Sequence, residues 1–144
     1  MRRFLIVTLP LIAIALAAAG CDNSGGTTAP TVAAPVLTTE TFTGTVKPQG
    51  SDSHTFTAAQ TGQINVTLTA AGPPATIFMG LGVGTPSTTD ATVCSLFSTA
   101  TLSAQASTVA QISGTANAGT YCVTVFDIGN QSADITYTVT VAHP

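Results

Sequence analysis

The chain has 144 residues, only 6% of them are charged, and its formal net charge is −3 at pH 7. After residue 20, Lys47 is the only base against six acids, so this region has a net charge of −5. Nucleic-acid binding needs clustered Lys and Arg to contact the phosphates, so this charge balance excludes a nucleic-acid partner. The length suits one domain of ordinary size rather than two.

Residues 1–20 have the three parts of a secretory signal peptide. Arg2 and Arg3 give a basic start, residues 4–19 are almost wholly apolar, and small residues close the segment. The apolar run is shorter than the roughly 20 residues that a membrane-spanning helix needs. We therefore predict that residues 1–20 are removed on export.

The small residues 17–20 lead directly to Cys21. This arrangement resembles the lipobox of bacterial lipoproteins, although Ala18 stands where leucine is commoner. The resemblance implies cleavage after Gly20 and a thioether-linked diacylglycerol on Cys21. The alternative is an ordinary signal peptide that is cut near Ala19 and leaves Cys21 unmodified.

A lipid on Cys21 determines where the protein is found. One acyl chain holds a protein to a bilayer only reversibly, whereas two or three hold it firmly. We expect a lipid anchor in a membrane of the bacterial cell envelope, with the protein facing the periplasm or the cell surface. Residues 21–38 are rich in Gly, Ser, Thr, Ala and Pro without an apolar period, which predicts a flexible linker between the anchor and the domain.

Residues 39–144 show the alternation of apolar and polar side chains that is typical of strands. The chain has 28 threonines and no tryptophan, which also favours strands over helices. We predict eight strands, at residues 40–46, 53–58, 63–70, 76–83, 91–97, 108–113, 120–127 and 134–141. Short strands separated by Gly, Pro and Asn turns indicate an all-β fold, an antiparallel β-sandwich.

Four segments combine this spacing with turn glycines in a way that resembles the bacterial pre-peptidase C-terminal domain: residues 50–56, 62–68, 118–125 and 135–141. The resemblance covers residues 39–144 and implies a jelly-roll-like sandwich. Members of that family usually follow secreted peptidases, where they aid secretion or bind substrate. This chain has no room for a peptidase, and it lacks the acidic cluster with which collagen-binding relatives hold calcium.

Cys94 and Cys122 remain as a pair if Cys21 is lipidated. Exported proteins meet an oxidising compartment, so we predict a Cys94–Cys122 disulfide. Such a bond closes a loop of about 28 residues, for which chain entropy gives about 3–4 kcal/mol of stability. The alternative is two buried thiols that pack as small apolar groups.

The run Ser51-Asp52-Ser53-His54 places a serine, an acid and a histidine side by side. A catalytic triad is built in space, usually from separate chain segments. Neighbours entering a strand point to alternate sides, so we interpret this run as a polar hairpin edge and predict no catalytic residues. The glycine run of residues 80–84 is interpreted as part of a strand and loop, because no helix follows it to hold a phosphate.

Metal ligands are sparse. His54 and His143 are too few for zinc, which takes three or four ligands, and calcium needs six to eight oxygens. Asp127 and Asp134 flank the last loop, where they either share one weak calcium site or, more simply, form turns. We predict no metal site and no cofactor.

The aromatic side chains offer no evident sugar-binding platform. Tyr121 and Tyr137 lie on the apolar sides of their strands. Phe78, Phe97 and Phe126 fall off the inward pattern, and we expect them to pack against the second sheet rather than to form an exposed patch.

These observations favour a membrane-tethered, non-enzymatic β-sandwich that acts as a binding or accessory module at the cell envelope. Its partner, beyond the bilayer that holds Cys21, is an unidentified protein or carbohydrate. One alternative is a structural envelope protein without a specific ligand. A second alternative is a hydrolase whose site is assembled from distant loops.

Overall fold

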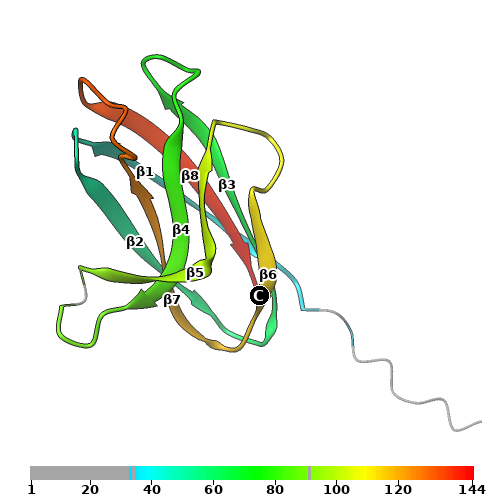
Figure 1. Ribbon diagram of the computed structural model, residues 1–144. Coiled ribbons are helices and arrows are strands. Elements are labelled where there is room, and N and C mark those ends of the chain that lie inside the picture. Colours follow the sequence, from blue (N-terminus) through cyan, green and yellow to red (C-terminus); the bar gives the residue numbers. More distant parts are fainter. Residues whose placement is uncertain (1–32, 34, 91) are drawn as a thin grey trace, which may run out of the picture. The chain divides into compact units, whose positions relative to one another are not determined.

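The computed structural model describes residues 33, 35–90 and 92–144. The predicted signal peptide, Cys21 and most of the predicted linker lie outside these residues. The described part is all-β (Figure 1), with strands β1 (Thr38–Val46), β2 (Ser51–Ala58), β3 (Gly62–Gly72), β4 (Met79–Pro86), β5 (Cys94–Ala104), β6 (Ile112–Ala116), β7 (Gly119–Phe126) and β8 (Ile135–His143). All eight predicted strands are present, and residues 33–144 as described contain no helix that could span a membrane.

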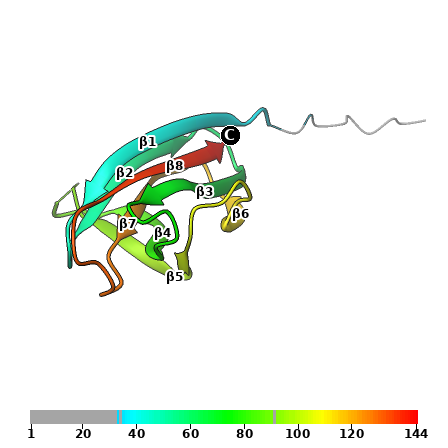
Figure 2. The ribbon, with the colours of Figure 1, turned by 90° about the horizontal axis from the view of Figure 1, so that it is seen from above.

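The strands form two antiparallel sheets of four strands each. Sheet A has the order β1-β8-β3-β6, and sheet B has the order β2-β7-β4-β5. The two sheets face each other as the layers of a sandwich (Figure 2). The predicted fold class is therefore confirmed.

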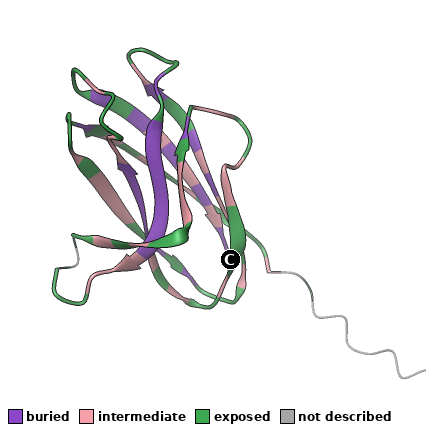
Figure 3. Ribbon diagram, in the orientation of Figure 1, coloured by how far each residue is buried: buried purple, intermediate pink, exposed green. Residues whose placement is uncertain are grey.

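The core lies between the sheets and consists of the alternate, inward-facing side chains. In β8, Ile135, Tyr137, Val139 and Val141 are 0–3% exposed, while the threonines between them face outward. Burial follows the same alternation along β1 and along β3 as far as Leu68 (Figure 3). Removing this apolar surface from water, at about 25 cal/mol per Å², drives the two sheets together.

β4 is buried on both of its faces. Its inward side chains belong to the core, and its outward positions are Gly80, Gly82 and Gly84. A Cβ on Gly80 would collide with the ring of Phe126, and one on Gly84 would collide with the backbone of Ser95. The glycine run therefore lets neighbouring chain segments lie directly on the outer face of sheet B.

The predicted disulfide is present in this covered region. Cys94 begins β5 and Cys122 lies in β7, with their Cα atoms 5.9 Å apart. The sulfur of Cys122 faces the outer side of sheet B, and the residue is 1% exposed. Gly84 of β4 pairs with Cys122, so the bond crosses over β4 and fastens β5 to β7.

β5 differs most from its predicted range, residues 91–97. Gly82 pairs with Thr101 and Gly84 pairs with Leu96, so residues 97–100 oppose Val83 alone. The hydroxyl of Thr101 donates to the carbonyl of Phe97 at 2.8 Å and closes this wide bulge. A bulge interrupts the two-residue period, and the second half of the strand is therefore invisible to a search for alternation.

Each edge strand carries a feature that discourages pairing with another chain. β1 and β2 each have an inward-pointing acid, Glu40 and Asp52. β5 has its bulge, and β6 has only five residues. Inward charges, bulges and short edges all oppose edge-to-edge aggregation.

The sandwich has two open sides. The side between the edge strands β1 and β2 is called the β1–β2 seam, and the side between the edge strands β5 and β6 is called the β5–β6 groove.

Candidate functional site

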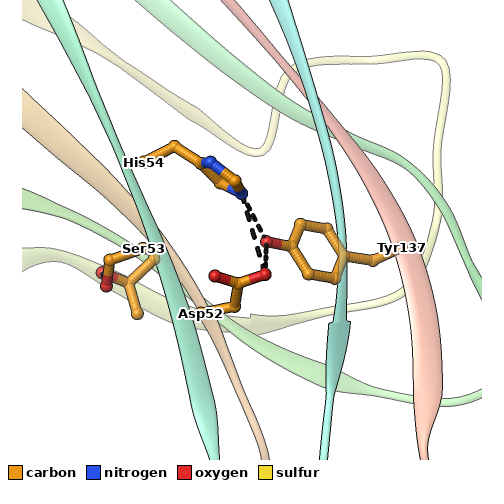
Figure 4. A network of polar contacts seen from close by, with 5 residues as sticks. Asp52, Ser53, His54 and Tyr137 are labelled. Carbon is orange, nitrogen blue, oxygen red and sulfur yellow. Dashed lines mark hydrogen bonds and ion pairs between the residues drawn. The ribbon is translucent and has the colours of Figure 1, made fainter. Parts of the chain in front are cut away.

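Polar side chains from both sheets meet on the β1–β2 seam. Along β2, Asp52, His54 and Phe56 point inward, because residues two apart share one face of a strand. Ser53 points to the other face, where its hydroxyl oxygen is 2.9 Å from that of Thr124 on β7. Figure 4 shows Ser53 turned away from the acid and the histidine.

Tyr137 of β8 joins the inward side chains of β2 to sheet A (Figure 4). Its hydroxyl donates to Oδ2 of Asp52 at 2.8 Å. Nε2 of His54 lies 2.8 Å from the same hydroxyl and 3.8 Å from Oδ2 of Asp52. Since the hydroxyl donates to the carboxylate, the network assigns the remaining hydrogen to Nε2 of His54, which donates to the tyrosine oxygen.

Two residues of β1, Phe42 and Gly44, lie against the three side chains of this network. The ring of Phe42 stacks on His54 with a centroid distance of 4.9 Å and an interplanar angle of 11°. Gly44 pairs with Tyr137 across β1 and β8, and a Cβ on Gly44 would collide with the Asp52 carboxylate and lie 2.7 Å from the tyrosine oxygen. Glycine is therefore required at this position for the three side chains to meet.

Burial and the neighbouring carboxylate determine the protonation state of Tyr137. Burial raises the pKa of the phenol well above its ordinary value, and the hydrogen bond and negative charge of Asp52 raise it further. The hydroxyl is therefore protonated at neutral pH and acts as a donor. The side chains of Asp52 and His54 are 33% and 26% exposed, so solvent reaches both.

An open depression of about 550 Å³ lies beside the cluster, with Phe42, Asp52, His54 and Thr92 among its lining residues. Small ligands can therefore approach the acid and the histidine from solvent. The cluster contains an acid, a histidine and a protonated phenol, but the serines of the same strand segment lie on its opposite face. Within the described ranges, no three His, Cys, Asp or Glu side chains gather as metal ligands.

The second histidine occupies a different part of the same seam. Nε2 of His143 lies 2.8 Å from Oε1 of Glu40, and its side chain is 6% exposed. Its ring contacts Phe56 at a centroid distance of 5.3 Å. Nδ1 is buried and has no hydrogen-bond partner among the residues that the structure describes. The structure thus gives each histidine its own carboxylate and does not combine them in one site.

Asp127 anchors the turns near the seam. Its carboxylate accepts hydrogen bonds from the backbone N–H groups of Gln49, Gly129, Asn130 and Gln131. These bonds, above all the one from Gln49, hold the pKa of Asp127 below its ordinary value. The carboxylate is thus oriented by backbone donors, as the turn interpretation predicts, and Asp134 makes none of these bonds.

The β5–β6 groove is the contrasting, apolar hollow of about 280 Å³. Phe97, Ile112, Ala116 and Tyr121 contribute to its walls.

The prediction that the three off-pattern phenylalanines, Phe78, Phe97 and Phe126, pack against the second sheet is wrong. Phe97 is 41% and Phe78 is 46% exposed. The ring of Phe126 lies over Gly80 on the outer face of sheet B, because the missing Cβ leaves space there.

The sequence predicts only a polar hairpin edge at Asp52 and His54, and it gives no sign of their partner. Tyr137 lies on the apolar side of its strand, as predicted, and the structure adds the hydrogen bond of its hydroxyl to Asp52. The two-residue spacing of Asp52 and His54 indicates that they share one face of β2. A glycine on the neighbouring strand, here Gly44, indicates that side chains can approach its backbone closely.

No family model matches this chain, and no curated protein matches it.

Proposed function

We propose that the chain is a lipid-anchored protein of the bacterial cell envelope and that its β-sandwich is a non-enzymatic binding or accessory module. The order of segments supports this role: a signal-like segment, Cys21 at its end, a linker, and a β-sandwich that begins with β1 at Thr38. The resemblance to the pre-peptidase C-terminal domain supports an accessory role as well.

The observation that carries the non-enzymatic part of the proposal is the alternation in β2. A serine hydrolase needs its nucleophile hydrogen-bonded to the histidine. Here Ser53 bonds to Thr124 on one face of β2, while His54 bonds to Tyr137 on the other. The protonated phenol already donates to Asp52, which makes it a poor nucleophile.

Activity assays on the purified full chain test this part. A panel of ester, peptide and glycoside substrates should give no turnover above that of a matched His54→Ala variant. Turnover that His54→Ala abolishes would contradict the proposal and revive the hydrolase alternative.

Mass spectrometry of the membrane fraction tests the anchor. The mature protein should lack residues 1–20 and carry acyl mass on Cys21. The matched Cys21→Ser variant should leave the membrane fraction. An unmodified N-terminus near residue 20, with the same distribution in Cys21→Ser, would show an ordinary exported protein instead.

A further inference from the structure

β2 is an edge strand of sheet B, so one of its two sides has no neighbouring strand in the part of the chain that the structure describes. The open depression of about 550 Å³ lies along this side. Five consecutive residues of β2, Ser51–Thr55, line it together with Phe42 of β1 and Thr92 of the loop between β4 and β5. Because neighbouring residues of a strand point to opposite faces, a hollow lined by five in a row follows the edge of the strand rather than one face.

The hydrogen-bond pattern of β2 shows which backbone groups face the depression. The N–H of Asp127, directly after β7, donates to the carbonyl of Gly50, directly before β2, at 3.0 Å. Antiparallel pairs alternate between those that exchange hydrogen bonds and those that do not. Every second residue from Gly50 onward therefore bonds to β7. The residues between them, Ser51, Ser53 and Thr55, direct their N–H and C=O groups to the open edge, which no other strand of the described chain covers.

The negative charge at this edge is not balanced by the chain itself. Oδ2 of Asp52 accepts a hydrogen bond from Tyr137, whereas Oδ1 makes none within the described ranges, and the side chain is 33% exposed. Lys47 is the only base after residue 20, and it forms no ion pair with Asp52 in the part of the chain that the structure describes. An exposed carboxylate oxygen beside unpaired backbone groups favours a cationic side chain as its partner.

We propose that the open edge of β2 binds an extended segment of a partner protein that carries a Lys or Arg opposite Asp52. The segment adds as a strand to sheet B and pairs with the backbone of Ser51, Ser53 and Thr55, while its base lies against the carboxylate. The inference rests on the proposed binding role and names its partner. A second copy of this chain does not fit, because pairing through β2 would place two Asp52 side chains on one face without a counter-charge.

The inward acid gives this edge its selectivity. An apolar or acidic strand paired here would leave Asp52 without a counter-charge, which is how the acid opposes unspecific pairing. In an antiparallel addition, Asp52 falls in a pair without mutual hydrogen bonds, where Cα atoms are about 4.5 Å apart and side chains are closest. The bond from Tyr137 holds the carboxylate in place before a partner arrives. The same charge therefore rejects most strands and admits a basic one.

Calorimetric titration of the purified full chain with synthetic peptides tests the proposal. The probe is a seven-residue peptide of alternating Thr and Val with Lys at its centre in place of Val, so that Val and Lys face inward. Matched peptides carry Gln or Glu at the centre, and a fourth has N-methyl groups on the two Thr residues beside Lys. We expect saturable binding of one Lys peptide per chain, at least about threefold tighter than the Gln peptide. The Glu and N-methylated peptides should not bind.

Two changes in the protein separate the charge from the backbone pairing. Asp52→Asn should bind the Lys and Gln peptides equally. Thr55→Pro removes an N–H at the open edge, where proline is tolerated, and should lose binding, whereas the matched Thr55→Ala keeps the N–H and should bind normally.

Hydrogen exchange on the wild type gives a readout that needs no variant to fold. The amides of Ser53 and Thr55 should exchange fast in the unbound chain and slowly with the Lys peptide. Equal binding of the Lys and Glu peptides, no binding of either, or unchanged exchange at Ser53 and Thr55 would overturn the proposal, as would self-association through β2 in sedimentation. The tests of the anchor and of turnover use other measurements, so this failure would be distinguishable from failure of the proposed function.

Discussion

The two open sides of the sandwich are closed in different ways. Along the β1–β2 seam, Tyr137 reaches across to Asp52 and His54, and Phe42 stacks on His54. Along the β5–β6 groove, apolar side chains line a hollow and Phe97 is 41% exposed. A short turn joins β1 to β2, with Gly50 donating to the carbonyl of Lys47, whereas on the other side a bulge interrupts the pairing of β5 with β4.

This difference shows where each side obtains its order. Directional hydrogen bonds fix the seam, and their geometry depends on a glycine. The groove side depends on the disulfide, because β5 is an edge strand whose pairing with β4 is interrupted and whose first residue is bonded to β7. The following substitutions test this division, from the largest expected effect to the smallest.

The disulfide should make the largest single contribution. The double variant Cys94→Ala/Cys122→Ala should lose about 3–4 kcal/mol of unfolding free energy, because the unfolded chain regains the entropy of an open loop. Urea unfolding of the purified protein measures this loss, and Cys21→Ser is the control that keeps the disulfide. An unchanged denaturation midpoint in the double variant would show that β5 is held by other contacts.

Gly44→Ala should destabilise the seam by about 1–3 kcal/mol, the usual cost of overpacking. The added methyl group collides with the Asp52 carboxylate and crowds the Tyr137 hydroxyl. Gly114→Ala in β6 is the matched control, because a Cβ there meets nothing within 4 Å. Thermal unfolding of both variants should separate them, and equal melting temperatures would mean that the seam relaxes freely.

Tyr137→Phe should cost about 1–3 kcal/mol, since it leaves the partly buried Asp52 and His54 without their shared partner. The raised pKa adds a signature at high pH. A phenol whose folded pKa lies above its unfolded value of 10.0 contributes stability below pH 10, and this contribution is lost as the pH rises above that value. The stability of the wild type should therefore fall above pH 10 by more than that of Tyr137→Phe, whereas parallel curves would show that Tyr137 is not buried in solution.

Most of the fold follows from patterns that the sequence displays directly. Alternation locates β3, β7 and β8, and the expected export of the chain predicts the pairing of Cys94 with Cys122. β5 is the exception, because residues 97–100 form a bulge that no two-residue period describes. Alternation also fails to show that outward glycines in β4 admit Phe126.

The candidate site was only half predictable for a related reason. The two-residue spacing of Asp52 and His54 places them on one face of β2. Their meeting with Tyr137 depends on how the two sheets are aligned, and Tyr137 is 83 residues from His54 in sequence. Local pattern carries no information on that alignment, which arises from the packing of the whole core.

The smallest effect should come from Phe97, and its contrast with Phe42 tests the comparison most directly. Both are phenylalanines at an open side of the sandwich. Phe42 packs against the core cluster and stacks on His54, so Phe42→Ala should cost at least about 1 kcal/mol through lost burial and the lost ring pair. Phe97 is 41% exposed and lies on a bulge, so Phe97→Ala should change the unfolding free energy by no more than about 0.5 kcal/mol. Urea unfolding of the two variants under one set of conditions measures the difference. If Phe97→Ala costs as much as Phe42→Ala, the groove side is closed in solution around that ring, and the two sides are then held alike.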